Sequence, residues 1–203
     1  MDPQSPEAPN TYTSAKGMAR SANQDEIRRI GKSAMIIDKK INEAFPTWYK
    51  KPEPPNLPEH KVIYDENVFM DETFFHITGK DEEGRDNDRY ERVVLANARF
   101  CFDKQEKPIL HLTDNNNKTA EIQLGDKNKK FMKELSEYQA RISRAFSDDS
   151  LSGSEQTKKA NDANNDRRLA IANNTLVAGI FKEISSGTSL DNVAIRAAGG
   201  SIT

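Results

Sequence analysis

The stretch YERVVLANARFCFDKQEKPILHLTD, residues 90–114, decides the fold that we expect for this chain. Polar and apolar residues alternate along its first half, which is the pattern of a β-strand with one face in a core. One face collects only aliphatic and aromatic residues: Val94, Ala96, Ala98, Phe100 and Phe102. A nucleic-acid platform would instead place aromatic and basic side chains on the same face. We therefore expect this face to pack in a core.

Similar runs surround the strand at 89–102, and they lie at 60–70, 73–78, 108–113 and 120–124. Turn-forming residues separate successive runs, as glycine, aspartate, asparagine and proline do between strands. Short turns between neighbouring strands are typical of an antiparallel meander. The sequence thus predicts an α+β fold around a small antiparallel meander of about five strands, closed as a sandwich or a partly open barrel.

Helical spacing appears on both sides of this meander. The run at 126–146 repeats apolar residues every three or four positions, so we expect an amphipathic helix that covers the sheet. A second helix is expected at about 157–186, with Leu169 and Leu176 on its stripe, and a short one after Gly187. The run at 21–45 has the same spacing, which predicts an N-terminal helix.

The predicted organisation has six parts. They are a flexible arm at 1–20, an amphipathic helix at 21–45, a proline-rich connector at 46–59, a β module with its covering helix at 60–148, a linker at 149–156 and a C-terminal helical segment at 157–203. Because proline lacks an amide donor and disfavours helix before it, the connector should be extended. We expect it to lie along a surface, anchored by Trp48 and Tyr49.

Composition limits the size of the core. Hydrophobic residues make up 35% of the 203 residues and charged residues 31%, so much of the chain should be solvated helix, loop or arm. The chain starts with a polar, proline-bearing stretch rather than a secretion signal, and no apolar run reaches the roughly 20 residues of a membrane span. We expect a soluble cytoplasmic protein without a membrane partner.

Signatures of catalysis or metal binding are scarce. His60, His76 and His111 fall on three predicted strands, so a two-histidine metal or acid–base site is an open alternative to ordinary strand histidines. The acidic loop at 81–91 lacks the residue order of a calcium loop. Cys101, the one cysteine, excludes an internal disulfide and lies in an apolar run. We predict no catalytic residue, no metal ligand and no cofactor, and hence no enzyme.

The leading hypothesis is a non-catalytic protein-interaction or assembly subunit. Amphipathic helices appended to the β module would bury their apolar stripes against another copy of the chain or against another protein. The residues expected to contact this partner are Ile30, Ile37, Ile41, Trp48, Leu176, Ile180 and Phe181.

The alternative hypothesis is an accessory protein that binds nucleic acid, in the manner of single-strand-binding proteins. Between 126 and 146 six basic residues face three acidic ones, whereas 60–125 carries nine basic and fourteen acidic residues. A basic helix is therefore the better candidate surface than the sheet. The residues expected to contact phosphates are Lys127, Lys129, Lys130, Lys133, Arg141, Arg144, Lys158, Lys159, Arg167 and Arg168. An ordinary solvated helix face would show the same charges.

Overall fold

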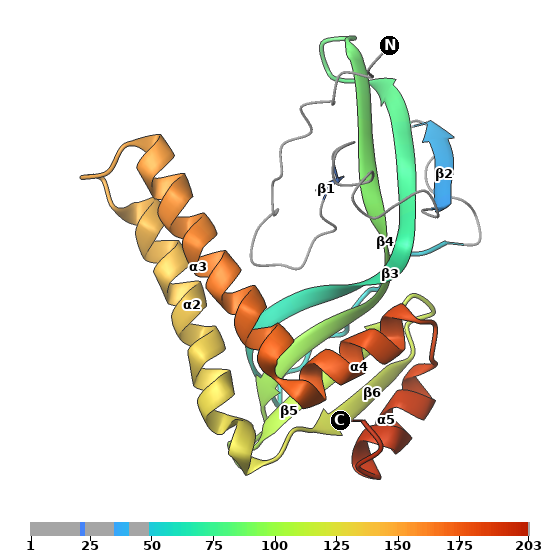
Figure 1. The fold of residues 1–203 in the computed structure, drawn as a ribbon, viewed down its shortest axis with the longest axis vertical. Helices are drawn as coiled ribbons and strands as arrows, with labels where there is room; N and C mark the ends of the chain where they lie inside the picture. The colour runs from blue at the N-terminus through green and yellow to red at the C-terminus, as the bar shows by residue number, and fades with distance from the viewer. Residues whose placement is uncertain (1–20, 23–34, 41–48, 203) are drawn as a thin grey trace.

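Two long antiparallel strands organise the sheet. These are β3 (Lys61–Lys80) and β4 (Asp86–Phe102) in a computed structural model that describes residues 21–22, 35–40 and 49–202. The predicted strands at 60–70 and 73–78 are thus one continuous strand. β5 (Pro108–Asp114) and β6 (Thr119–Gln123) follow as an antiparallel meander beside β4. The structure confirms an α+β fold with a mostly antiparallel sheet (Figure 1).

A large bulge divides the β3–β4 pair into two parts. Phe69 lies opposite Val94 and Phe74 lies opposite Arg92, so residues 70–73 of β3 face a single residue of β4. Glu72, within this bulge, has a φ of 54°. The part beyond the bulge, which we call the β arm, carries the β3–β4 turn and projects away from the rest of the sheet (Figure 1).

The prediction of an N-terminal helix at 21–45 is wrong in the two described pieces of that range, which are strands. β1 (Ser21–Ala22) pairs with β4, and β2 (Met35–Lys40) runs parallel to β3 along the β arm. The β-branched Ile36 and Ile37 suit a strand, and pairing with β3 satisfies the backbone groups that a helix would satisfy internally. The predicted arm at 1–20 lies outside the described residues. So do three predicted partner residues, Ile30, Ile41 and Trp48.

Four helices follow the sheet: α2 (Lys129–Ser147), α3 (Gly153–Asn173), α4 (Thr175–Ser185) and α5 (Leu190–Ala198). The predicted helix at 157–186 is two helices, because Asn174 ends α3 and its side chain accepts a hydrogen bond from the Val177 amide of α4. α2 and α3 form an antiparallel hairpin that leaves the sheet, whereas α4 and α5 lie over it (Figure 1). A short 3-10 turn, η2 (Asp126–Asn128), precedes α2.

The main core lies between the sheet and the helices. Phe100, Leu110 and Leu112 of the sheet are fully buried in one cluster with Leu135 of α2 and Ile180 of α4. The apolar face predicted for β4 is therefore confirmed as a core face. The described strands form one open sheet that runs from β2 to β6, so the expected sandwich or barrel is not seen among the described residues.

The proline-rich connector covers the opposite face of the sheet. Its described part, residues 49–59, we call the strap. Tyr49 is buried against Phe75, and its hydroxyl accepts a hydrogen bond from the Val94 amide at 3.0 Å. Farther along, Arg99 of β4 donates to the Pro55 carbonyl at 2.7 Å. The strap thus lies along the protein surface, as predicted, with Tyr49 as one anchor.

Candidate interaction site

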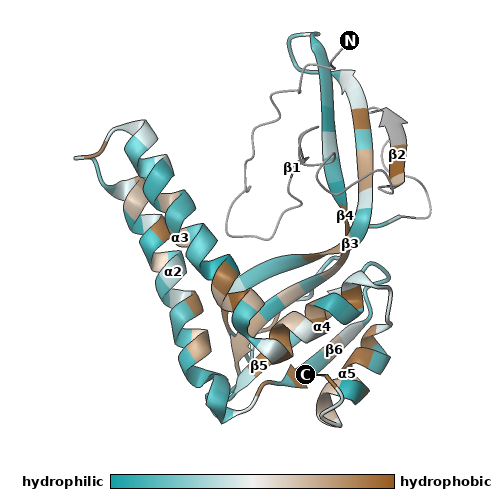
Figure 2. Cartoon of the chain, in the orientation of Figure 1, coloured by the Kyte–Doolittle hydropathy of each residue, from teal (hydrophilic) through white to brown (hydrophobic). Residues whose placement is uncertain are grey.

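The α2–α3 hairpin is built by its own sequence. Ser152 and Glu155 form a capping box that starts α3, and the buried Ala160 and Ala163 allow the two helices to approach closely. Arg141 of α2 pairs with Asp166 of α3 at 3.0 Å. The outer half of the hairpin projects beyond the sheet and is mostly hydrophilic (Figure 2). Its surface is therefore available to other molecules on several sides.

A shallow hollow opens on the hairpin between α2 and α3. Phe131 and Tyr138 line it from α2, and Leu169 and Ala170 line it from α3, with Glu134 and Asp166 among the polar residues around them. Leu169 is 61% exposed although it is a large aliphatic residue. An exposed aliphatic side chain beside aromatic lining is the kind of surface that protein partners cover.

Sequence reasoning missed this hollow because it treated 157–186 as one helix. On an unbroken helix, Leu169 would share a stripe with Leu176 and point to the core. The break at Asn174 separates the two: Leu176 packs against the core, while Leu169 is exposed. The signal that could have found the break is the run Asn173–Asn174–Thr175, since asparagine is a preferred helix cap.

A polar cluster joins the hairpin to the sheet. Arg167 of α3 is 7% exposed, and its guanidinium lies 4.2 Å from the centre of the Tyr64 ring of β3. It donates hydrogen bonds to Gln139 of α2 at 2.9 Å and to Asn164 at 2.6 Å. Glu66, two residues after Tyr64, lies on the same face of β3 and its Oε2 is buried without a hydrogen-bond partner. We call these residues the joint of the hairpin.

Burial dominates the electrostatics of the joint. Desolvation raises the pKa of Glu66 to about 7, and the positive charge of Arg167 only partly opposes this rise, while Asp65 adds to it. Burial also raises the pKa of the Tyr64 hydroxyl. A carboxyl group on the helix-covered face is thus close to its titration point at neutral pH.

Four of the predicted partner residues are described, and they pack mostly against other residues of the same chain. Ile180 is fully buried, and Leu176 and Phe181 are half-buried against the same core. Ile37 of β2 is half-buried and packs with Tyr49 and neighbours in a smaller cluster on the β arm. The α4 stripe is therefore occupied within one chain, and partner binding by these residues remains a prediction.

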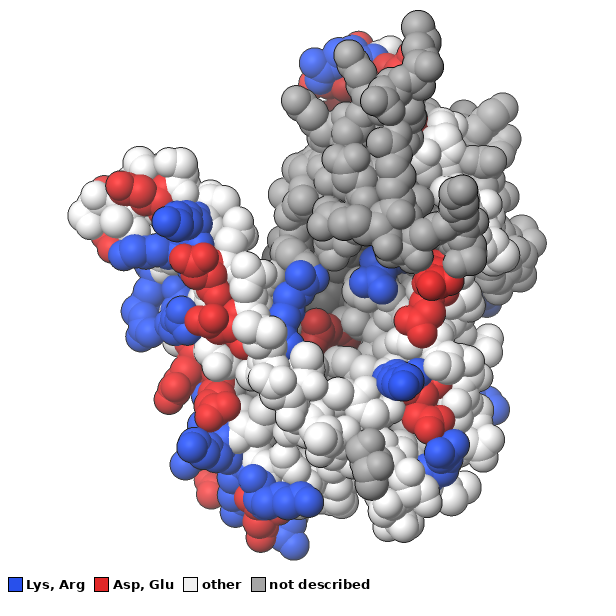
Figure 3. Space-filling model, in the orientation of Figure 1, with Lys and Arg blue, Asp and Glu red and all other residues white. Residues whose placement is uncertain are grey.

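The predicted phosphate contacts are divided. Eight of the ten are exposed on the hairpin and the turn before it: Lys127, Lys129, Lys130, Lys133, Arg141, Arg144, Lys158 and Lys159. Arg167 belongs to the joint, and Arg168 is half-buried. Acidic residues alternate with the basic ones along the visible face of the hairpin, and blue atoms gather most densely at its lower end (Figure 3). The charges do not form one basic surface in this view.

The three histidines have different partners and different surroundings. His60 Nε2 is 2.7 Å from Glu121 Oε1, and this hydrogen bond raises the pKa of His60. His76 contacts Asp88 on the β arm. His111 is buried with its Nδ1 unpartnered, and desolvation lowers its pKa. Among the described residues, no three histidine, cysteine or acidic side chains lie close enough together to hold a metal ion.

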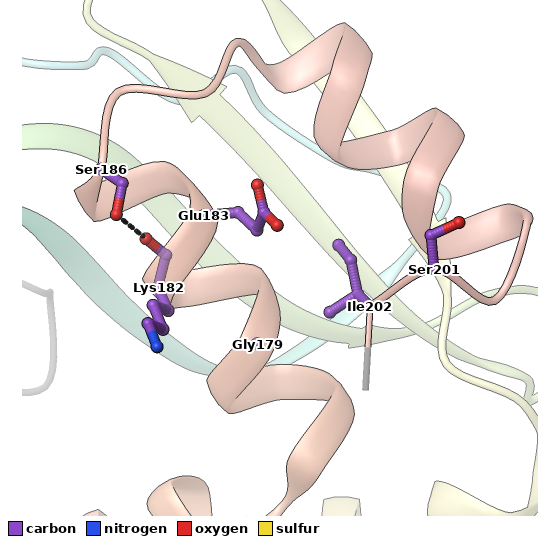
Figure 4. Close-up of a pocket in the computed structure, with 6 residues that line it drawn as sticks. All are labelled: Gly179, Lys182, Glu183, Ser186, Ser201 and Ile202. Carbon is purple, nitrogen blue, oxygen red and sulfur yellow. Dashed lines mark hydrogen bonds between the residues drawn. The ribbon is translucent and has the colours of Figure 1, made fainter.

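A second hollow lies where α4 meets the C-terminal segment (Figure 4). Gly179, Lys182, Glu183, Ser186, Ser201 and Ile202 line it. The carboxylate of Glu183 is engaged by its own chain, since Arg196 pairs with Oε1 at 3.0 Å and the Thr188 hydroxyl donates to Oε2 at 3.0 Å. We assign no function to this hollow, because its carboxylate already has partners within the chain.

Comparison with known proteins adds no relative. No family model, no curated protein and no solved structure matches this chain. Within the part of the chain that the structure describes, each helix is too short or too polar to cross a membrane.

Proposed function

We propose that this protein is a non-catalytic interaction subunit that assembles through its α2–α3 hairpin. The observation that carries the proposal is the hollow between α2 and α3, where Leu169 is 61% exposed beside Phe131 and Tyr138. A hairpin that projects from the sheet and carries an exposed aliphatic residue on its face is suited to pack against another helix.

A second copy of the chain is the partner that the charges favour. Glu134 and Arg141 are seven residues apart on α2, so they lie on the same side of the helix about 10 Å apart, with Tyr138 between them. If two hairpins packed antiparallel about Tyr138, the Glu134 of each would face the Arg141 of the other. Such a two-fold contact is self-complementary, as a symmetric dimer requires.

Sedimentation equilibrium of the purified chain tests this proposal. The monomer mass is 22.9 kDa, and we expect twice that mass at micromolar concentrations. Leu169→Asp should weaken the dimer about 100-fold or more, because a carboxylate would have to lose its water in the contact. Ile195→Asp is the matched control, since Ile195 is also an aliphatic residue exposed on a helix. A monomeric wild-type chain, or equal effects of both substitutions, would contradict the proposal.

A second candidate function is nucleic-acid binding at the start of α2. The first turn of α2 contains no acidic residue and has no side-chain cap. Lys129 and Lys130 are exposed in this turn, and Lys127 is exposed just before it. Lysines placed where the helix dipole is already positive are unfavourable for the helix itself. They would be stabilised by a bound phosphate.

A titration with single- and double-stranded oligonucleotides at low salt tests this candidate. We expect affinity to fall steeply with added salt, and reversal of Lys129, Lys130 and Lys133 to glutamate to abolish binding. Reversal of Lys104, Lys107 and Lys118, which are exposed outside the hairpin, makes the same change in net charge and is the control. Binding that survives the first triple reversal would exclude the start of α2 as the contact surface.

A further inference from the structure

The joint of the hairpin contains one acceptor and one donor that are both unsatisfied. Glu66 Oε2 and Arg167 Nε are each shut off from solvent and have no hydrogen-bond partner. Buried polar atoms normally have partners, because losing water without replacement costs free energy. Two such atoms of opposite character at one junction indicate that the observed arrangement is one of two that the joint can adopt.

The hydrogen bonds of Arg167 go to groups other than Glu66. Its two terminal nitrogens donate to Gln139 and Asn164, and its guanidinium plane covers the Tyr64 ring. Of these contacts, Gln139 belongs to α2, so Arg167 ties both helices of the hairpin to β3 through one side chain. Drawing Arg167 toward Glu66 would loosen these contacts.

The protonation of Glu66 decides which arrangement is favoured. A neutral carboxyl can remain in the observed position at modest cost, whereas a carboxylate there is a buried charge. The charged groups that act on it are Arg167 of α3 and Asp65 of its own strand, along with the Tyr64 hydroxyl, while α2 contributes the uncharged Gln139. A carboxylate would therefore either attract Arg167 or admit water into the joint.

We propose that Glu66 is a proton-sensitive latch that fixes the α2–α3 hairpin to the sheet when neutral and releases it when ionised. Two observations support the latch: the two unsatisfied atoms at the joint, and the contacts of Arg167 with both helices and with Tyr64 of β3. The near-neutral pKa of about 7 places the change within the physiological range. The inference holds whether or not the hairpin binds a partner.

Hydrogen exchange of the α2–α3 amides tests the latch. With a pKa of about 7 in the closed joint and the ordinary 4.5 in the open one, protection factors corrected for intrinsic exchange should fall about tenfold between pH 6 and pH 8. Glu66→Gln keeps the shape of a neutral carboxyl, so the fall should disappear. Glu137→Gln, which removes an exposed carboxylate from α2 outside the joint, should leave the fall unchanged.

A direct titration keeps the proposal testable even if a variant folds poorly. The side-chain carboxyl carbon of Glu66 in the unsubstituted protein should titrate with a midpoint near pH 7 in a carbon-detected nuclear magnetic resonance experiment. A midpoint near the ordinary 4.5 would overturn the latch. So would equal protection of the hairpin at pH 6 and pH 8, or an equal fall in the Glu66→Gln variant.

Discussion

The two faces of the sheet are both buried, yet they are covered in different ways. The face under α4 and α5 presents Phe100, Leu110 and Leu112 at 0% exposure in one apolar cluster. The face under the strap presents polar side chains from β4 and β5 beside the buried Cys101 and Ile109. Several of their atoms are buried without a partner, namely Asn97 Oδ1, His111 Nδ1 and Thr113 Oγ1.

This difference shows that the segment covering each face of the sheet suits the side chains of that face. Apolar packing is non-directional, so helices with an apolar stripe can cover one face from many angles. A polar face needs acceptors at defined places. Pro55 offers a carbonyl to Arg99 and, lacking an N–H, brings no donor of its own that must be satisfied. A proline-rich strap is therefore a suitable cover for a buried polar face.

Truncating Phe100, at the centre of the apolar face, should cause the largest loss of stability. Phe100 contacts aromatic rings of β3, α2 and α4, namely Tyr64, Phe131 and Phe181. Phe100→Ala should lower the free energy of unfolding by about 3–5 kcal/mol, because it removes buried apolar area and leaves a cavity. Phe146→Ala, at a side chain that is 56% exposed, is the matched control. Urea denaturation measures both, and similar losses would mean that the helix-covered face is not the core.

Removing the polar link to the strap should have an intermediate effect. Arg99→Met keeps most of the side-chain volume but removes the bond to Pro55 and the ion pair with Asp65 at 3.3 Å. We expect a loss of about 2 kcal/mol, typical of hydrogen bonds with a charged group. Tryptic cleavage after the exposed Lys50 of the strap should also become faster. Arg85→Met, at the exposed turn, is the control, and an unchanged cleavage rate in the Arg99 variant would contradict this role.

His111 should have the smallest effect, and one that depends on pH. Burial lowers its pKa below the ordinary 6.5, so the unfolded chain binds the proton more tightly. Its contribution to stability is therefore intact above pH 6.5 and is lost as the pH falls below that value.

Comparing wild type with His111→Gln between pH 7.5 and pH 5.5 isolates this contribution. The wild type should lose about 1 kcal/mol more than the variant over this interval. His60→Gln provides a control of opposite sign, because the bond to Glu121 raises the pKa of His60 and favours folding at the lower pH. Equal pH dependence of wild type and His111→Gln would show that burial does not lower the pKa of His111.

Local patterns predicted much of the fold. Period-two alternation identified β4 and its core face, and the spacing of Phe131, Leu135 and Tyr138 identified α2. The helix break at Asn174 was missed because the apolar spacing continues across it. The strand at Met35–Lys40 was missed because its residues also fit a heptad pattern, and only pairing with β3 distinguishes the two.

The candidate site depended on information that no local pattern contains. The exposure of Leu169 follows from the end of α3, and the joint brings together Glu66 and Arg167 from distant parts of the chain. Arg167 was predicted as a phosphate contact because of its charge alone. Its burial over Tyr64 is a tertiary contact, and sequence spacing does not report such contacts.

Fraying of the β3–β4 ribbon should halt at the bulge between Phe69 and Phe74. The ladder is interrupted there, with four residues opposite Val93 alone, so melting of the distal ribbon need not propagate to strands clamped by the main core. Heating should therefore release amides of residues 74–92 in an early step and those of 94–102 in a later, global one. The bulge would thus separate two cooperative units, so that the β arm can open while the main core stays folded.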